Sequence, residues 1–168
     1  MAGALALACA QPAAAQTCHP LTGTWAFDAA ASRMGGGMSF NPYYAVAGIG
    51  LTLDAKPGRV MQSWHLTGAH LDEIDSYTTP TDGSEAATDA HSHLNTMPAR
   101  VQGTWEACTL VEAGTAMLFG QTVVTTSRFV VSADDRRLTI QQEAHSDLGD
   151  SYRTLVFMRA TTTGSTPR

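Results

Sequence analysis

The chain is divided into short runs of alternating apolar and polar residues, and no ten-residue window has the spacing of an amphipathic helix. Alternation with a period of two places the apolar side chains of a β-strand on one face. Clusters of glycine, proline and aspartate separate the runs. Pro57-Gly58 is one such turn, because proline presets φ and glycine takes the positive-φ position. The pattern predicts an all-β fold built as a meander.

The predicted strands extend over most of the chain from residue 21 onward. They are Leu21–Phe27, Gly48–Leu53, Val60–Leu66, Leu71–Thr78, Ala99–Val111, Met117–Val131, Leu138–Ala144 and Tyr152–Met158. Antiparallel strands in a domain of this size close most naturally into a barrel, which removes exposed edges. We therefore predict a single antiparallel up-and-down β-barrel of roughly eight to ten strands, with a β-sandwich as the alternative.

The first sixteen residues carry no charge and consist largely of alanine and leucine. The small residues Ala13–Ala15 suit a signal peptidase, so we expect residues 1–16 to be a signal peptide whose basic start is missing. The apolar run is shorter than the roughly 20 residues that span a bilayer. We expect a secreted or periplasmic protein without an integral membrane span. One barrel domain would occupy residues 17–160, and residues 161–168 would form a disordered tail.

Charge and motifs exclude several functions. Fifteen acidic residues stand against ten basic ones, which argues against a nucleic acid partner, since that would need a basic face. Gly35–Gly37 is not a phosphate loop, because no Gly-Lys-Ser/Thr follows it. No Gly-x-Ser-x-Gly nucleophile motif is present. We therefore expect no cofactor and assign no catalytic residue.

Two cysteines remain after the leader, Cys18 and Cys108. In an exported chain such a pair is more often a disulfide than a metal site. The bridge would close a loop of about 90 residues and stabilise the fold by roughly 4 kcal/mol in the loop-entropy estimate. Two unpaired thiols are the alternative.

Several motifs resemble one family. Gly23-Thr24-Trp25, followed by Asp28 and Ser32, resembles the GTW-x-L-N-x-x-K-S opening of bacterial secreted lipocalin-like proteins, which are calycin-type β-barrels. Val130–Asp134 resembles the start of their V-S-A-D-G-K-T-L-T hairpin, and the closing strand over 152–159 resembles their last barrel strand. The departures are Asp28 in place of asparagine, Ala31 in place of lysine and Asp135-Arg136 in place of Gly-Lys.

The resemblance implies an exported barrel with an internal cavity. It also implies that Gly23 and Trp25 are structural, with Trp25 closing one end of the barrel. In lipocalins an arginine of the last strand packs over this tryptophan, and Arg159 or Arg153 could take that role. The middle lipocalin motif, Thr-Asp-Tyr, is absent.

Aromatic and methionine side chains are the best candidates for a ligand site, because broad and polarizable groups adapt to hydrophobic molecules. The alternative is that they only fill the core. The residues predicted to bind a small hydrophobic ligand are Tyr43, Tyr44, Met61, Trp64 and Phe129 as wall residues and Arg128 or His65 as a polar contact. The first hypothesis is therefore a non-enzymatic barrel that binds such a molecule.

Histidines support a second hypothesis. If the segment around His91 and His93 is a strand, both imidazoles project from one face, close enough to share a metal. Asp89 would point the same way, and His65, His70 or His145 could supply a third ligand. A solvated polar loop is the alternative for this segment. A barrel enzyme using a histidine with a carboxylate, or this metal, thus remains open, as does a pocket-free envelope interaction module.

Overall fold

The protein is described by a computed structural model, in which residues 20–36, 48–68, 71–92, 95–118, 120–147 and 149–161 are placed. This part of the chain forms eleven β-strands. They are β1 (Gly23–Phe27), β2 (Arg33–Gly36), β3 (Gly48–Lys56), β4 (Arg59–Gly68), β5 (Leu71–Pro80), β6 (Ala86–Ser92), β7 (Asn95–Glu106), β8 (Thr109–Leu118), β9 (Gln121–Val131), β10 (Arg137–Ser146) and β11 (Gly149–Arg159). The described residues contain no helix long and apolar enough to cross a membrane.

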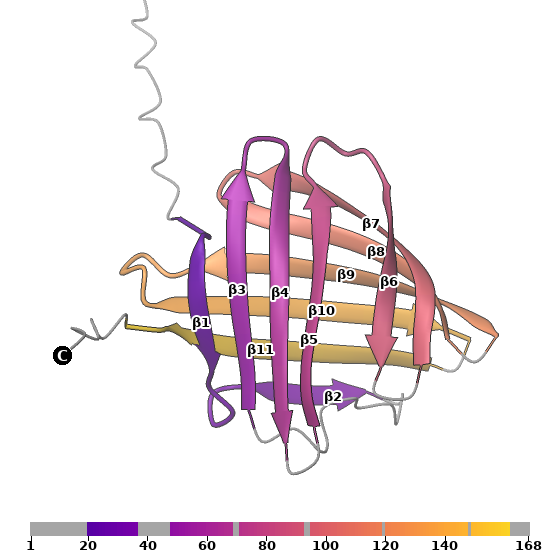
Figure 1. Cartoon of the computed structure of the whole chain (residues 1–168), viewed down its shortest axis with the longest axis horizontal. Coiled ribbons are helices and arrows are strands. Elements are labelled where there is room, and N and C mark those ends of the chain that lie inside the picture. The colour runs from indigo at the N-terminus through magenta and orange to yellow at the C-terminus, as the bar shows by residue number, and fades with distance from the viewer. Residues whose placement is uncertain are drawn as a thin grey trace, which may run out of the picture.

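Ten of the strands form one antiparallel path, in the order β5-β4-β3-β1-β11-β10-β9-β8-β7-β6, and β2 pairs with β11 beside it. Figure 1 shows β1, β3, β4 and β5 running across β9, β10 and β11, which lie behind them. The chain is therefore an all-β, up-and-down, nearly closed barrel, as the alternation predicts. The β-sandwich alternative is not adopted.

One end of the barrel is filled with large apolar side chains, and we call this end the floor. A single cross-strand row, Leu110–Phe129–Ile140–Leu155, runs over β8 to β11 with every member at most 2% exposed. Trp25, Leu51, Leu53, Val60, Leu138 and Phe157 complete the packing. Because every second side chain of a strand points to the same face, the alternation brings these apolar residues together in the core.

Arg159 fastens the floor at the chain ends. Its guanidinium carbon lies 4.1 Å from the centroid of the Trp25 ring, and its nitrogens donate to the carbonyls of Asp135, Thr22 and Pro20 at 2.7, 2.9 and 2.9 Å. A Cβ on Gly23 would clash with the guanidinium and displace it, so glycine at this position allows the contact. Of the two arginines considered for this role, Arg159 takes it and Arg153 does not.

The polar residues that follow the opening strand have structural roles. The Asp28 carboxylate accepts from the amides of Ala30 and Ala31, both at 3.1 Å, and so shapes the turn into β2. The Ser32 hydroxyl accepts from the amide of Val156 at 2.8 Å. The Asp28 bonds thus fix the turn after β1, and the Ser32 bond attaches this turn to β11.

The barrel has one break in its hydrogen bonding. No ladder joins the described residues of β5 and β6. At the floor end the break is closed by close approach, since a Cβ on Gly103 of β7 would lie 2.8 Å from Thr79 Cγ2 and 2.9 Å from the carbonyl oxygen of Pro80. The amide of Gly83, in the connecting loop, donates to the Gly103 carbonyl at 3.2 Å. Glycine at 103 thus lets β5 meet β7 directly.

Two predicted runs are each divided by a turn. Ala99–Val111 contains the β7–β8 turn, where Ala107 has φ 52°, and Met117–Val131 contains the β8–β9 turn. Neither β2 nor β6 was predicted as a definite strand. The proposed leader at 1–16 and all of the tail at 161–168 except its first residue lie outside the described residues, as does Cys18. Its pairing with Cys108 stays a prediction.

Candidate functional site

A row of polar side chains crosses the barrel interior directly above the floor. On β8 to β11 the cross-strand row is Glu112–Ser127–Gln142–Arg153, and on β4 and β5 the facing pair is Gln62–Tyr77. All six are in phase with the buried apolar residues of their strands, so they point inward. We call these six residues the polar belt.

The belt is joined by hydrogen bonds around Glu112, which is 8% exposed. Glu112 Oε2 accepts from Gln62 Nε2 and from the Thr79 hydroxyl, both at 2.5 Å. Glu112 Oε1 lies 3.2 Å from the Tyr77 hydroxyl, which is also 3.2 Å from Gln62 Oε1. Gln62 Nε2 further donates to Thr79 Oγ1 at 3.2 Å. Side chains of three strands, β4, β5 and β8, thus meet at one carboxyl group.

Burial raises the pKa of the Glu112 carboxyl, because removal from water disfavours its charged form. Hydrogen bonds from Thr79, Tyr77 and Gln62 act in the opposite direction but do not outweigh the burial. On the far side of the belt, Gln142 Nε2 donates to the Ser127 hydroxyl oxygen at 3.1 Å. The hydrogen bonds of the belt thus form two groups, one around Glu112 and one between Gln142 and Ser127.

Above the belt the inward-facing side chains of β8 to β11 become small. The next cross-strand row on β8 to β11 is Gly114–Thr125–Ala144–Ser151, where the floor has leucine, phenylalanine and isoleucine. Several inward residues on this side of the belt are partly exposed to solvent: Trp64, Leu66, Glu73, Asp75, Gly114, Ala116 and Thr125. The same face of the strands is fully buried at the floor. The inward face is thus fully buried at the floor and partly exposed on this side of the belt, where Val123, Ala144 and Ser151 are still buried.

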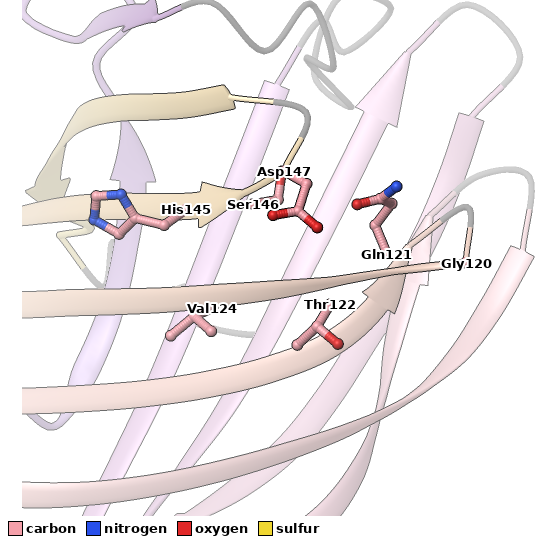
Figure 2. A pocket seen from close by; sticks show the side chains of 7 residues that line it. All are labelled: Gly120, Gln121, Thr122, Val124, His145, Ser146 and Asp147. Carbon is pink, nitrogen blue, oxygen red and sulfur yellow. The ribbon is translucent and has the colours of Figure 1, made fainter.

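An open depression of ≈ 620 Å³ lies at the rim of this accessible end. It is lined by Gly120, Gln121, Thr122, Val124, His145, Ser146 and Asp147. Figure 2 shows Gln121 and Asp147 beside each other at the ends of neighbouring hairpins, with His145 and Val124 further along their strands. Inward residues and outward residues both contribute, so the depression is a shallow feature of the rim.

The structure divides the predicted ligand residues between the two faces of the sheet. Trp64 and Phe129 point inward, Trp64 as a half-buried wall residue in edge contact with Phe157 and Phe129 as part of the floor. Met61, His65 and Arg128 lie on the outer face, since Met61 is 49% exposed and the other two are also exposed. These three side chains therefore do not line the barrel interior. Tyr43 and Tyr44 lie outside the described residues.

The described histidines pair with exposed carboxylates on the outer face. His65 Nε2 lies 2.6 Å from Asp72 Oδ1, and His145 Nδ1 lies 2.9 Å from Asp150 Oδ1. The residues that the structure describes contain no group of three His, Cys, Asp or Glu placed to hold a metal ion. The backbone of His91 belongs to β6, but its side chain and His93 lie outside the description, so that candidate site stays a prediction.

The sequence does indicate the belt, through polar residues that stand at positions in phase with buried apolar residues. Gln62 stands in phase with Val60 and Trp64, and Glu112 stands in phase with Leu110. A polar residue at an apolar phase marks either a strand error or a buried polar site. Gln62, Thr79 and Glu112 were not predicted as site residues, because aromatic, methionine and histidine side chains are the more obvious ligand candidates in the sequence.

Comparisons with solved structures give the fold. A structure titled "REP1-NXSQ fatty acid transporter" aligns with a TM-score of 0.54 at 10% sequence identity, over 84% of this chain and 96% of that chain. Secretory abundant heat soluble protein 4 from Ramazzottius varieornatus aligns with a TM-score of 0.49 at 13% identity, over 86% of this chain and 98% of its own. The chain shares the nearly closed barrel architecture of fatty-acid-binding and lipocalin-like proteins.

Comparisons of the sequence alone identify no family for this chain. No known protein family and no curated protein matches the chain. At 10% identity, the structural likeness establishes the fold alone.

Proposed function

We propose that this barrel binds a small, largely apolar molecule in the accessible half of its interior, above the polar belt. The observation that carries the proposal is the change along the inward face of β8 to β11 from large, fully buried side chains to small ones, two of which are partly exposed. Packed interiors are filled at near-crystalline density, so the row of Gly114, Thr125, Ala144 and Ser151 is unusual for a purely structural core.

The chemistry of the wall favours a molecule with an apolar body. Trp64 and Leu66 present apolar surface on β4, and Val123 and Ala144 present it on β9 and β10. Ligand sites of this kind are mostly apolar, with a few polar groups that fix orientation. The belt offers such groups at the base, and its Tyr77 hydroxyl is partly exposed. The barrel fold shared with a protein titled a fatty acid transporter is consistent with this use of the interior.

Nile red, an uncharged apolar dye whose emission increases out of water, tests the proposal. We expect saturable binding by the wild type and loss of at least tenfold in affinity in Ala116→Trp, whose side chain would enter the accessible interior. Thr115→Trp is the matched control, because Thr115 is the neighbouring residue on the same strand and points outward. Both variants should melt cooperatively. Equal dye binding by the two variants, or none by the wild type, would refute an interior site.

Native mass spectrometry of protein purified without refolding tests the same point with natural molecules. An added mass of a few hundred daltons that is lost on denaturation, and that is absent from Ala116→Trp but present in Thr115→Trp, is the expected result. An added mass retained equally by both variants would place the carried molecule outside the interior.

A further inference from the structure

The barrel is closed at its one break by side chains in place of a backbone ladder. β5 and β6 share no described ladder, and the close approach at Gly103 holds β5 only at the floor end. Thr79, which makes this close approach, also bonds the Glu112 carboxyl of β8 together with Tyr77, the next inward residue of β5. Glu112 is the direct cross-strand partner of Gly103, so the cluster begins at the closed point and extends along β5 from there.

The hydrogen bonds of the cluster accommodate a neutral Glu112. Gln62 Nε2 faces both Glu112 Oε2 and Thr79 Oγ1, which are themselves 2.5 Å apart and share one amide hydrogen, and the Thr79 hydroxyl donates to Glu112 Oε2. As a neutral acid, Glu112 can donate from Oε1 to the Tyr77 oxygen, while Tyr77 donates to Gln62 Oε1. An ionised Glu112 would place a buried charge among these uncharged groups.

The surroundings also disfavour a charge on Glu112. Among the described residues, β4 faces it with uncharged Gln62, β7 with Gly103 and β9 with Ser127, while β5 contributes Tyr77, Thr79 and, one step further along its inward face, Asp75. Arg153, the inward-facing cation of the belt, stands three strands away from Glu112 along the same cross-strand row. Burial accordingly raises the pKa of Glu112.

We propose that Glu112 is a proton-dependent clasp: as a neutral acid it holds β5 against β8 across the break in the barrel, and loss of its proton loosens β5 and widens the break. The opened side would give a bound molecule a lateral route to and from the interior. The clasp itself does not depend on ligand binding, whereas this consequence for release rests on the proposed function.

The sign of the pH dependence follows from the direction of the shift. An acid with a raised pKa in the folded state binds more protons folded than unfolded, so stability falls as pH rises. The contribution of Glu112 is complete below its unfolded pKa of about 4.3 and is lost as pH rises through the raised folded value. Glu112→Gln removes this dependence, because its amide supplies a permanent donor in place of the acid hydrogen.

Hydrogen exchange of the ligand-free protein across a pH series tests the clasp. The reporters are the amides of Thr81 and Gly83, which donate to Gly58 and Gly103 beside the break, and the amides of Arg159 and Ala160 serve as distant controls. Expressed as protection factors, the wild-type reporters should lose up to about tenfold per pH unit above the titration of Glu112, since one proton is linked to opening. The distant amides should not change in parallel.

Two variants and one direct measurement make the outcome decisive. Glu112→Gln should hold its reporter protection constant with pH, while Glu143→Gln, which changes an exposed outer-face glutamate, should behave as the wild type. Carboxyl carbon NMR of the wild type should show Glu112 still protonated well above pH 4.3. A Glu112 that titrates with the exposed glutamates, or reporters whose pH dependence survives Glu112→Gln, would overturn the clasp. Because no ligand is present, either result is independent of the Nile red test.

Discussion

Replacing Gly103 by alanine tests whether β5 and β7 meet as closely as the fold requires. The added Cβ would lie 2.8 Å from Thr79 Cγ2, 2.9 Å from the Pro80 carbonyl oxygen and 3.4 Å from Leu110 Cδ1. Real Cβ atoms do not approach a backbone oxygen at 2.9 Å without displacement. One strand must therefore move, and the movement would occur at the floor end of the break, next to Glu112.

The size of the effect follows from two opposing terms. Forcing one extra carbon into a packed site costs about 1–3 kcal/mol, while replacing glycine by alanine in a strand normally gains about 0.5–1 kcal/mol. We expect a net loss of roughly 1–2 kcal/mol, which lowers the melting temperature by about 2–8 °C for a domain of this size. Gly50→Ala is the matched control, because its Cβ meets only His65, at 3.6 Å from Cβ and 4.0 Å from the carbonyl oxygen, and should be neutral or slightly stabilising.

Thermal unfolding followed by circular dichroism measures both variants. If Gly103→Ala melts at or above the temperature of Gly50→Ala, the close approach of β5 and β7 is refuted. The local origin can be verified by hydrogen exchange, since the Gly83 amide should lose protection in Gly103→Ala while amides on β11 keep theirs.

Three further predictions concern the closed end and the covalent framework. Arg159→Met should lower the free energy of unfolding in urea by about 2–3 kcal/mol, because three hydrogen bonds and the contact with the Trp25 ring are lost together; an unchanged urea midpoint would contradict it. Asp135→Gly should raise the melting temperature by a few degrees, since Asp135 has φ 57° at the position where the lipocalin-like hairpin has glycine, and a lower value would show that its side chain matters more than the backbone strain. Cys108→Ser should lower stability by up to about 4 kcal/mol under oxidising conditions and leave it unchanged under reducing ones, if Cys18 and Cys108 pair as predicted.

The strand pattern was predictable where turn chemistry and alternation agree. Pro57-Gly58 and the hairpin after Val131 both carry turn residues, and both turns form where expected. The turn at Ala107-Cys108 carries no such signal, because alanine rarely adopts φ 52°, and the sequence therefore predicted one continuous run. Strand β6, rich in Ala, Asp and His, has low intrinsic β-propensity and acquires its conformation by pairing with β7.

The candidate site was less predictable for a different reason. Alternation places Phe129 and Arg128 on opposite faces of β9, and Trp64 and Met61 on opposite faces of β4. The barrel interior therefore cannot contain all four side chains. Aromatic and methionine content suggested a ligand wall without choosing a face. The buried acid was missed because its significance depends on Gln62 and Thr79, which are 50 and 33 residues away in sequence and meet it only through the barrel topology.

The polar belt gives the barrel a closure that a regular sheet could not provide. Backbone hydrogen bonds between β5 and β6 would have joined the edges permanently, because amide and carbonyl groups do not titrate near neutral pH. A carboxyl group buried among uncharged partners instead ties β5 to β8 across this break, and it does so only while it keeps its proton. The floor, whose Leu110–Phe129–Ile140–Leu155 row needs no polar contact, can remain folded when the clasp opens. Separating a permanent apolar floor from a titratable belt therefore allows one side of the barrel to open without unfolding the rest.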